Sequence, residues 1–226
     1  MQVKSKVFIL RKTRYGDNDL ILNCLTPEGA RVSLFARSAL RSKKRFGGGV
    51  LEPTHYVHVM YEDKGQQRLN TLKEASLIQD FPGLRTDYAR IEVGLYFVKL
   101  ISEIVKEGEV DSSEIFNLLG NTLRAAETSL QLEHLRTHFE VKLLANQGVL
   151  PHESEEQSLL ALSIVDHEKA ALSESDWLRL RGRVRRVLQE YLNIAQEANQ
   201  SNNVSANVST NASTNASTNG RTGSSR

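Results

Sequence analysis

The chain has 226 residues, a formal net charge of +2 and a single cysteine, Cys24. One cysteine excludes an intrachain disulfide and fits a reducing, cytoplasmic setting. The apolar run Val7 to Leu10 is too short for a signal peptide, and no run approaches the roughly 18 apolar residues of a membrane span. We therefore expect a cytoplasmic protein without a membrane partner.

Positive charge is concentrated in the first third of the chain. Residues 1–80 contain 14 Lys and Arg against 8 Asp and Glu, whereas residues 81–226 contain 15 against 19. The stretch RSALRSKKRFGGGV, residues 37–50, holds five cations, one aromatic and three glycines but no acid. This clustering indicates a face that binds a polyanion, and a solvated basic surface is the alternative.

The first 80 residues alternate between apolar β-branched runs and turn signals. The tetrad Thr26-Pro27-Glu28-Gly29 is typical of a type I turn and predicts a hairpin. In the strand that follows, Val32, Leu34 and Ala36 share one face. Five short strands of this kind predict a small barrel of the oligonucleotide/oligosaccharide-binding (OB) type, with an SH3-like barrel as the alternative. The expected strands cover residues 6–13, 19–26, 30–37, 55–62 and 68–78.

The pattern changes to helical periodicity after Pro82. Helices are predicted over 86–109, 111–128 and 130–148, with Gly148 ending the third. Ser173 and Asp176 form a capping box that opens a fourth helix, and residues 150–172 show no readable pattern. The apolar stripes expected for the first three helices are Tyr88, Ile91, Leu95, Val98 and Ile101; Ile115, Leu118, Leu119 and Leu123; and Leu132, Leu135, Phe139 and Leu143.

From residue 199 the chain is a low-complexity Asn/Ser/Thr sequence with no apolar residue larger than valine. Such a segment buries too little apolar surface to offset its ordering entropy, so we expect disorder. The predicted fold class is α+β. It comprises an OB-type five-stranded β-barrel domain (1–80), an α-helical domain (81–198) and a disordered C-terminal tail (199–226).

No catalytic or metal-binding constellation is evident. The three glycines at 47–49 are not followed by Lys-Ser/Thr, which excludes a nucleotide-binding P-loop. His134 and His138 share a helix face but lack a third ligand nearby. Cys24 lies in an alternating apolar segment and is expected to be a buried strand residue. We expect a protein that is not an enzyme and needs no metal or cofactor.

The basic stretch is the predicted nucleic-acid site. Binding a single strand requires cations that follow phosphates, an aromatic ring that stacks on a base, and a flexible backbone. Phe46 is the expected stacking residue and 47–49 the flexible backbone. The expected phosphate-binding residues are Arg37, Arg41, Lys43, Lys44 and Arg45, extended by Arg11, Lys12, Arg14, Arg31 and Arg68. The arginine-rich RLRGRVRR segment, residues 179–186, is instead expected to be a solvated helix face.

Three motifs, in order, resemble the RecO family of bacterial recombination and repair proteins. RYGDNDLILNCLTPEGARVSLFARSALRSKKRFGGGVLEP is similar to the opening of that family, LKEASLIQDFPGLRTDYAR to its link between barrel and helices, and FEVKLLANQGVLP to the last helix of its central bundle. The resemblance covers about residues 3 to 151. Many members carry two C-x-x-C pairs next, whereas this chain has only His152 and His167, which cannot replace a four-ligand zinc site.

The resemblance implies more than the residues alone. Members of the family bind single- and double-stranded DNA, anneal complementary strands and help load the RecA recombinase onto DNA coated by single-strand-binding protein. They work with RecR and contact the acidic C-terminal tail of single-strand-binding protein, and they are associated with the nucleoid. For DNA contact, the resemblance and the residues coincide on Arg37 through Phe46. An RNA-binding, translation-associated barrel and an adaptor for an acidic protein are the alternatives.

Overall fold

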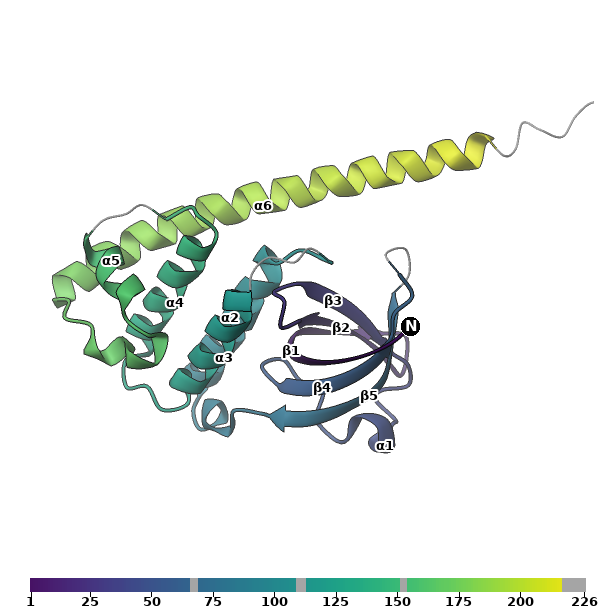
Figure 1. The fold of residues 1–226 in the computed structure, drawn as a ribbon, viewed down its shortest axis with the longest axis horizontal. Helices are drawn as coiled ribbons and strands as arrows, with labels where there is room; N and C mark the ends of the chain where they lie inside the picture. Colours follow the sequence, from purple (N-terminus) through teal and green to yellow (C-terminus); the bar gives the residue numbers. More distant parts are fainter. Residues whose placement is uncertain (66–68, 109–112, 151–153, 217–226) are drawn as a thin grey trace, which may run out of the picture.

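In the computed structural model, five strands form the N-terminal part of the chain (Figure 1). The structure describes residues 1–65, 69–108, 113–150 and 154–216, without the side chains of residues 43, 154 and 196–216. The strands are β1 (Gln2–Tyr15), β2 (Asp19–Leu25), β3 (Arg31–Ala36), β4 (Tyr56–Glu62) and β5 (Asn70–Gln79), and a short helix, α1 (Lys43–Phe46), lies between β3 and β4. The five predicted strands are thus confirmed, with β1 longer than expected.

The strands form a closed barrel in the order β1-β2-β3-β5-β4. The long β1 pairs with β4 through its first half and with β2 through its second half. A short parallel pairing, Leu34 with Asn70 and Phe35 with Thr71, joins β3 to β5. This arrangement is that of an OB-type barrel, so the structure decides between the two barrels that the sequence left open.

Alternation of side chains fills the barrel as predicted. Val32, Leu34 and Ala36 are buried in its core, together with Cys24 of β2. The Thr26–Gly29 turn is confirmed by the hydrogen bond from the Gly29 amide to the Thr26 carbonyl (3.0 Å), and Gly29 adopts a φ of 82° that favours glycine.

The first strand connects the barrel to the helices. Val7 and Ile9 point into the barrel core, whereas Phe8 and Leu10 belong to the core of the helical domain. The Phe8 ring lies 4.8 Å, centroid to centroid, from both Tyr56 and Phe116. The barrel and the helices therefore pack against each other through opposite faces of one strand.

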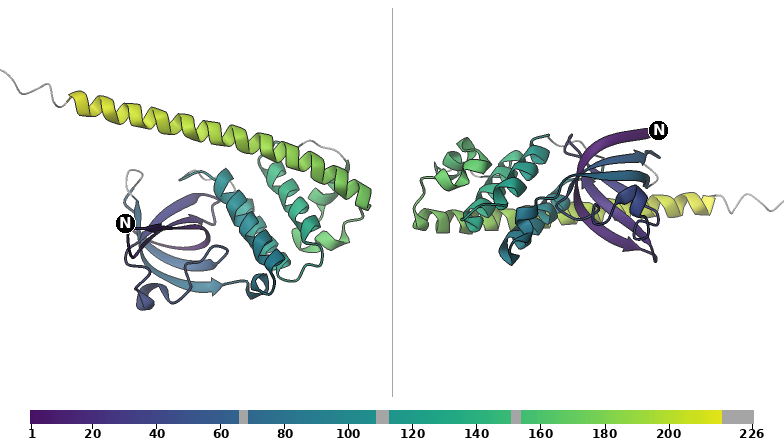
Figure 2. Two further views of the ribbon diagram at one scale, coloured as in Figure 1. Left: turned by 180° about the vertical axis from the view of Figure 1, so that it is seen from behind. Right: turned by 90° about the horizontal axis from the view of Figure 1, so that it is seen from below.

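Within the described residues, five helices follow the barrel. They are α2 (Tyr88–Ile104), α3 (Ser113–Ala126), α4 (Leu132–Asn146), α5 (Ser154–Ala161) and α6 (Glu174–Ala216), with 3-10 turns η1 (Pro82–Arg85) and η2 (Ile164–Lys169). Of these, α2 lies directly against β1, and α5 lies farther from the barrel (Figures 1 and 2). No helix in the described residues is long and apolar enough to cross a membrane.

The predicted apolar stripes are buried in α3 and α4 but only in part in α2. Ile115, Leu119 and Leu123 of α3 are fully buried, as are Leu135, Phe139 and Leu143 of α4. In α2, Val98 and Ile101 are buried, but Tyr88 and Leu95 are exposed. That part of the prediction was wrong because α2 turns Val93, Phe97, Leu100 and Ile104 toward the core instead.

The capping box is confirmed at the start of α6. The Ser173 hydroxyl accepts a hydrogen bond from the Asp176 amide, and the Asp176 carboxylate accepts one from the Ser173 amide, both at 3.2 Å. The helix continues to Ala216, beyond residue 199, where the sequence predicts a disordered tail. Residues 217–226 lie outside the described part, and for them the tail remains a prediction.

Candidate nucleic-acid interface

The basic segment, residues 37–46, crosses one end of the barrel between β3 and β4. Two hydrogen bonds attach its start to the β1–β2 turn. The Ser38 amide donates to the Asp19 carboxylate (2.6 Å), and the Leu40 amide donates to the Asn18 carbonyl (3.0 Å). The sequence predicts a loop here, and the structure adds the one-turn helix α1 within it.

The cations of the basic segment differ in solvent exposure and in the partners they bind within the protein. Arg37, Arg41 and Lys44 are exposed, and no carboxylate pairs with them in the described part of the chain. Arg45 is half-buried and donates to the Arg37 carbonyl (2.7 Å) and the Ser42 hydroxyl (3.2 Å). The side chain of Lys43 lies outside the described residues. Three of the five predicted cations are thus available to an anion, and Arg45 stabilises the turn of the segment.

Phe46 does not have the predicted role. Its side chain is 1% exposed and lies in the barrel core, with the Arg45 guanidinium 4.8 Å from its ring centroid. A buried ring cannot stack on a base, so the assignment of Phe46 as the stacking residue was wrong. The barrel end needs an apolar residue to close it, and Phe46 supplies it. Gly47 and Gly49, with φ of 57° and 75°, turn the chain away afterwards.

The cations proposed to extend the site are only partly available. Arg11 and Arg14 are exposed on β1. Lys12 pairs with Glu52, and Arg31 pairs with Glu107 (3.1 Å), so their charges are neutralised within the protein. Arg68 lies outside the described residues. Of the predicted cations, the exposed ones are therefore Arg11, Arg14, Arg37, Arg41 and Lys44.

Two aromatic side chains that the sequence analysis did not select lie beside these cations. Tyr15, at the end of β1, is 58% exposed, and its ring meets that of Phe35 on β3 edge to face, with centroids 5.9 Å apart. The register Thr13–Ile21–Phe35 places this pair on the outer face of β1, β2 and β3. OB-type barrels bind oligonucleotides on that face. We call Tyr15, Phe35 and Ile21 the aromatic face.

The signal for this face was present in the sequence. In β3, Phe35 alternates with the buried Leu34 and Ala36, which places its ring on the outside of the barrel. Phe35 is half-buried, so part of its ring remains accessible to a ligand on this face.

A carboxylate from the helical domain occupies the other end of the outer face. Glu107 accepts hydrogen bonds from the Ser33 amide (2.8 Å), the Ser33 hydroxyl (2.9 Å) and the Arg31 Nε (3.1 Å). The Arg31 amide also donates to the Lys106 carbonyl at 3.1 Å. The segment after α2 thus covers the edge of β3, and the accessible part of the face is the end near Tyr15.

The arginine-rich segment of α6 is mainly engaged in ion pairs. Arg183 donates to both oxygens of Glu156, at 3.0 and 3.1 Å, and Glu156 is 1% exposed. Arg181 pairs with Glu133 and Arg179 with Asp176. Three of the five arginines are thus paired with carboxylates, and Arg181 and Arg183 are half-buried, so the expectation of a solvated helix face was only partly correct.

The histidines have structural partners. His134 stacks on Trp177 with centroids 4.2 Å apart, and the His138 Nε2 lies 2.8 Å from the Leu159 carbonyl. His167 is buried, 2.8 Å from the Ser129 hydroxyl, and His152 lies outside the described residues. Within the described ranges, no three His, Cys, Asp or Glu side chains are grouped to hold a metal ion. Burial raises the pKa of the Cys24 thiol, which disfavours the nucleophilic thiolate.

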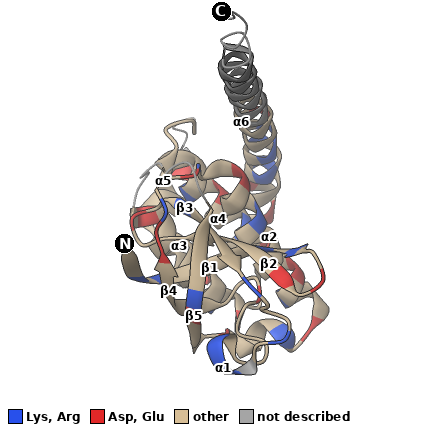
Figure 3. Cartoon of the chain, turned by 90° about the vertical axis from the view of Figure 1, so that its right-hand side faces the viewer, with Lys and Arg blue, Asp and Glu red and all other residues tan. Residues whose placement is uncertain are grey.

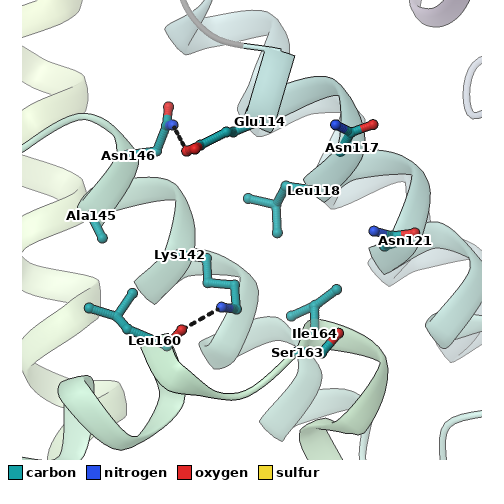
Figure 4. Close-up of a pocket in the computed structure, with 10 residues that line it drawn as sticks. All are labelled: Glu114, Asn117, Leu118, Asn121, Lys142, Ala145, Asn146, Leu160, Ser163 and Ile164. Atoms are coloured by element: carbon teal, nitrogen blue, oxygen red, sulfur yellow. Dashed lines mark hydrogen bonds between the residues drawn. The ribbon is translucent and has the colours of Figure 1, made fainter.

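The helical domain contains a pocket of about 460 Å³ between α3, α4 and the segment that follows α5 (Figure 4). Leu118, Leu160 and Ile164 give it an apolar lining, with amide side chains around them. Lys142 is its single cation, and the ammonium donates to the Leu160 carbonyl at 3.0 Å. Burial lowers the pKa of Lys142.

Two family models match the chain. Residues 1–81 match the family described as "Recombination protein O N terminal", and residues 85–159 match "Recombination protein O C terminal". The chain belongs to the RecO family. The family models divide close to the boundary between the barrel strands and α2, and they end within α5.

Similar curated proteins are named "DNA repair protein RecO". The protein from Alkaliphilus metalliredigens is 29% identical over 153 residues, which cover 67% of this chain and 61% of that protein. Those from Anaeromyxobacter dehalogenans and Pelobacter propionicus are 32% and 34% identical over 150 and 148 residues. These matches cover 66% of this chain and 58% and 59% of the relatives. The similarity thus spans about three fifths of the length of these RecO proteins.

Proposed function

We propose that this protein is a DNA-binding mediator of repair and recombination that acts by binding strands rather than by catalysis. Single-stranded DNA would lie on the aromatic face, with its bases on Tyr15 and Phe35 and its phosphates on the exposed cations of the basic segment. The observation that carries the proposal is the proximity of these two groups. Phe35 precedes Arg37 by two residues, and Asp19, which pairs with Tyr15 across the strands, anchors the Ser38 amide.

The chemistry of this arrangement suits a single strand with little sequence preference. Every base has a π-face on which an aromatic ring can stack, whereas cations follow the phosphates regardless of sequence. Five exposed cations would neutralise about five phosphates, and the logarithm of affinity would then fall with the logarithm of salt at a slope of about −3.5.

The test is fluorescence anisotropy of a labelled single strand of about 30 nucleotides over a salt series. A triple variant, Arg37→Ala, Arg41→Ala and Lys44→Ala, is expected to bind at least tenfold more weakly at low salt. The loss of three phosphate contacts should reduce the steepness of the salt slope by about 2. The matched control carries Arg124→Ala, Arg185→Ala and Arg186→Ala, which remove the same charge from exposed helical positions. Equal losses in both variants would argue for net charge alone and contradict the proposed interface.

The alternative functions are distinguished in the same assay by adding RNA or an acidic peptide as a competitor of the labelled DNA. RNA that displaces DNA at equal concentration would favour the translation-associated alternative, because phosphates and stacking do not by themselves select the sugar. An acidic peptide that displaces the strand at similar concentration would favour the adaptor alternative. Under the proposal, unlabelled DNA is the strongest competitor.

Strand annealing, RecA loading, and binding to RecR and to the tail of single-strand-binding protein complete the proposed function. These activities and partners rest on the family resemblance alone. The pocket of Figure 4 is our candidate for the tail, since its apolar lining and the Lys142 ammonium suit an apolar and acidic peptide. Lys142→Ala should weaken binding of a labelled tail peptide several-fold and leave DNA binding unchanged. Unchanged peptide binding would remove this pocket as the candidate.

A further inference from the structure

A second cationic surface lies on the opposite side of the barrel from the aromatic face. It is a groove of about 660 Å³ between α1 and the outer faces of β1, β4 and β5. Lys44 and Arg45 of the basic segment form one wall. The strands provide the floor, which includes Lys4, His58, Glu74 and Ser76. We call this surface the strand groove.

The register of the strands orders its side chains in rows. Lys6 lies opposite His58, which lies opposite Ser76. The next row consists of Lys4, Met60 and Glu74. Lys4 and Lys6 point outward because Val7, at the alternate position, is buried in the barrel. They are two residues apart on one strand, hence separated by about 6.8 Å along it, a spacing comparable to that of successive phosphates in an extended strand.

The charges of the strand groove favour an anion. Lys4, Lys6 and Lys44 are exposed, and no carboxylate forms an ion pair with them in the described residues. Glu74 is the one acidic residue in the lining. His58 and Ser76 add polar groups that can hydrogen-bond phosphate oxygens.

The strand groove differs from the aromatic face in one respect. Apart from the imidazole of His58, no aromatic side chain lines it. The groove can therefore contact a backbone, but it offers no phenyl, phenol or indole ring for a base to stack on. Regular cation spacing along a strand also fits a repeating polyanion better than a peptide with scattered acids.

The basic segment connects the two surfaces. Arg37 follows directly after β3, beside the aromatic face, and Lys44 and Arg45 line the strand groove. Figure 3 shows α1, coloured blue for Lys and Arg, at this end of the barrel. One short segment thus contributes cations to both sides of the barrel.

We propose that the strand groove binds the sugar–phosphate backbone of a second nucleic-acid strand while the aromatic face holds the bases of the first. This inference rests on the proposed function for the first strand and adds a site for the second. The two strands would meet at the basic segment, where exposed cations reduce the repulsion between their phosphates.

The single cysteine allows a direct test. Because Cys24 is fully buried, a cysteine introduced at an exposed position is the accessible thiol for labelling. Ser76→Cys places a fluorophore in the strand groove, and Thr13→Cys places one beside the aromatic face. Both residues are exposed. Titration with single-stranded DNA should change the Thr13→Cys signal at the first equivalent of strand and the Ser76→Cys signal at the second.

A charge variant gives the second arm. Lys4→Ala with Lys6→Ala should leave the affinity of the first strand within about twofold and weaken capture of the second at least fivefold, measured by energy transfer between two labelled strands. The control, Lys99→Ala with Lys169→Ala, removes the same charge from the helical domain and should leave both unchanged.

The outcomes separate the two proposals. A silent Thr13→Cys reporter with a responding Ser76→Cys reporter would contradict the aromatic face and leave the groove supported. A Ser76→Cys reporter that stays silent, or that responds to polyglutamate more strongly than to DNA, would overturn the groove. Equal losses of first and second strands in the lysine variant would overturn it too, because they would indicate one continuous path.

Discussion

The rings of Tyr15 and Phe35 meet edge to face, with their planes at 88°, on the exposed side of the barrel. Replacing Tyr15 by alanine removes the more exposed ring, and stacking on one base contributes about 1–3 kcal/mol. We therefore expect Tyr15→Ala to weaken single-strand binding by about 5- to 100-fold, measured by anisotropy.

The salt slope distinguishes stacking from charge. Tyr15→Ala removes no cation, so the slope should equal that of the wild type, and Tyr15→Phe should keep most of the affinity. A changed slope in Tyr15→Ala would contradict a pure stacking role. Loss of binding in Tyr15→Phe would instead assign the contribution to the hydroxyl.

Phe46→Ala is expected to affect folding. Removal of a fully buried phenylalanine costs about 3–5 kcal/mol in the free energy of unfolding, and Phe46→Leu should cost considerably less. Urea denaturation followed by circular dichroism measures both. If Phe46→Ala kept wild-type stability but lost DNA binding, the ring would have a direct role in the site after all.

Acid should destabilise the helical domain through His138. Burial lowers the pKa of His138 to about 4, whereas an unfolded histidine titrates near 6.5. The unfolded state therefore binds the proton first, and stability falls as the pH decreases from about 6.5 toward 4. In total, protonation of His138 lowers the free energy of unfolding by roughly 3 kcal/mol. Its contribution is complete above pH 7.

A variant isolates that histidine from the others. His138→Gln keeps a hydrogen-bonding side chain for the Leu159 carbonyl but cannot be protonated. The difference in unfolding free energy between pH 7 and pH 5 should be smaller in this variant than in the wild type. An identical difference in both proteins would assign the acid sensitivity to other groups, such as His167, whose pKa burial also lowers.

The Glu156–Arg183 pair should anchor α6 to α5. Arg183→Ala would leave the carboxylate of Glu156 buried without this partner, and breaking such a pair costs about 3–5 kcal/mol. Glu156→Gln with Arg183→Met should recover much of the loss, because it also removes the buried charge. Urea denaturation of both variants measures this, and a double variant less stable than Arg183→Ala would contradict the proposed contribution of the pair.

Glu107 should limit DNA binding at the far end of the outer face. Its carboxylate occupies the Ser33 amide and the Arg31 side chain, the kind of donors that a phosphate would use. Glu107→Gln is expected to raise single-strand affinity and to steepen the salt slope by about 0.7, equivalent to one added phosphate. Lower affinity in this variant would mean that the contact positions the barrel for binding.

Local patterns predicted the parts of the fold that depend on local rules. Val32 and Leu34 occupy alternate positions of a β-branched and apolar run, and Ser173 and Asp176 have the three-residue spacing of a cap, so both features were visible in the sequence. Apolar residues of α2 recur at three- and four-residue steps on more than one face of the helix, so a stripe with Tyr88 and Leu95 was as plausible as one with Phe97 and Leu100. Only the packing against α3 and α4 decides between them.

The charged residues of the candidate site were predictable from the sequence, whereas its aromatic residues were not. A run of cations needs solvent, which is why Arg37, Arg41 and Lys44 were correctly expected on the surface. Phe46 belongs to the same run, and its burial depends on closure of the barrel below it, a tertiary effect. Residues 150–172 were unreadable because polar side chains such as Glu156 and His167 are buried there, which no apolar periodicity reveals.

The alternation of Phe8 with Val7 and Ile9 has a consequence for the orientation of the barrel relative to the helical domain. Because neighbouring side chains of β1 belong to two different cores, the strand cannot turn about its own axis without disrupting both. If the barrel binds DNA as proposed, that DNA would be held at a fixed angle to any partner bound by the helices. Its 5′-to-3′ polarity would become a physical orientation toward or away from a protein docked on the helical domain.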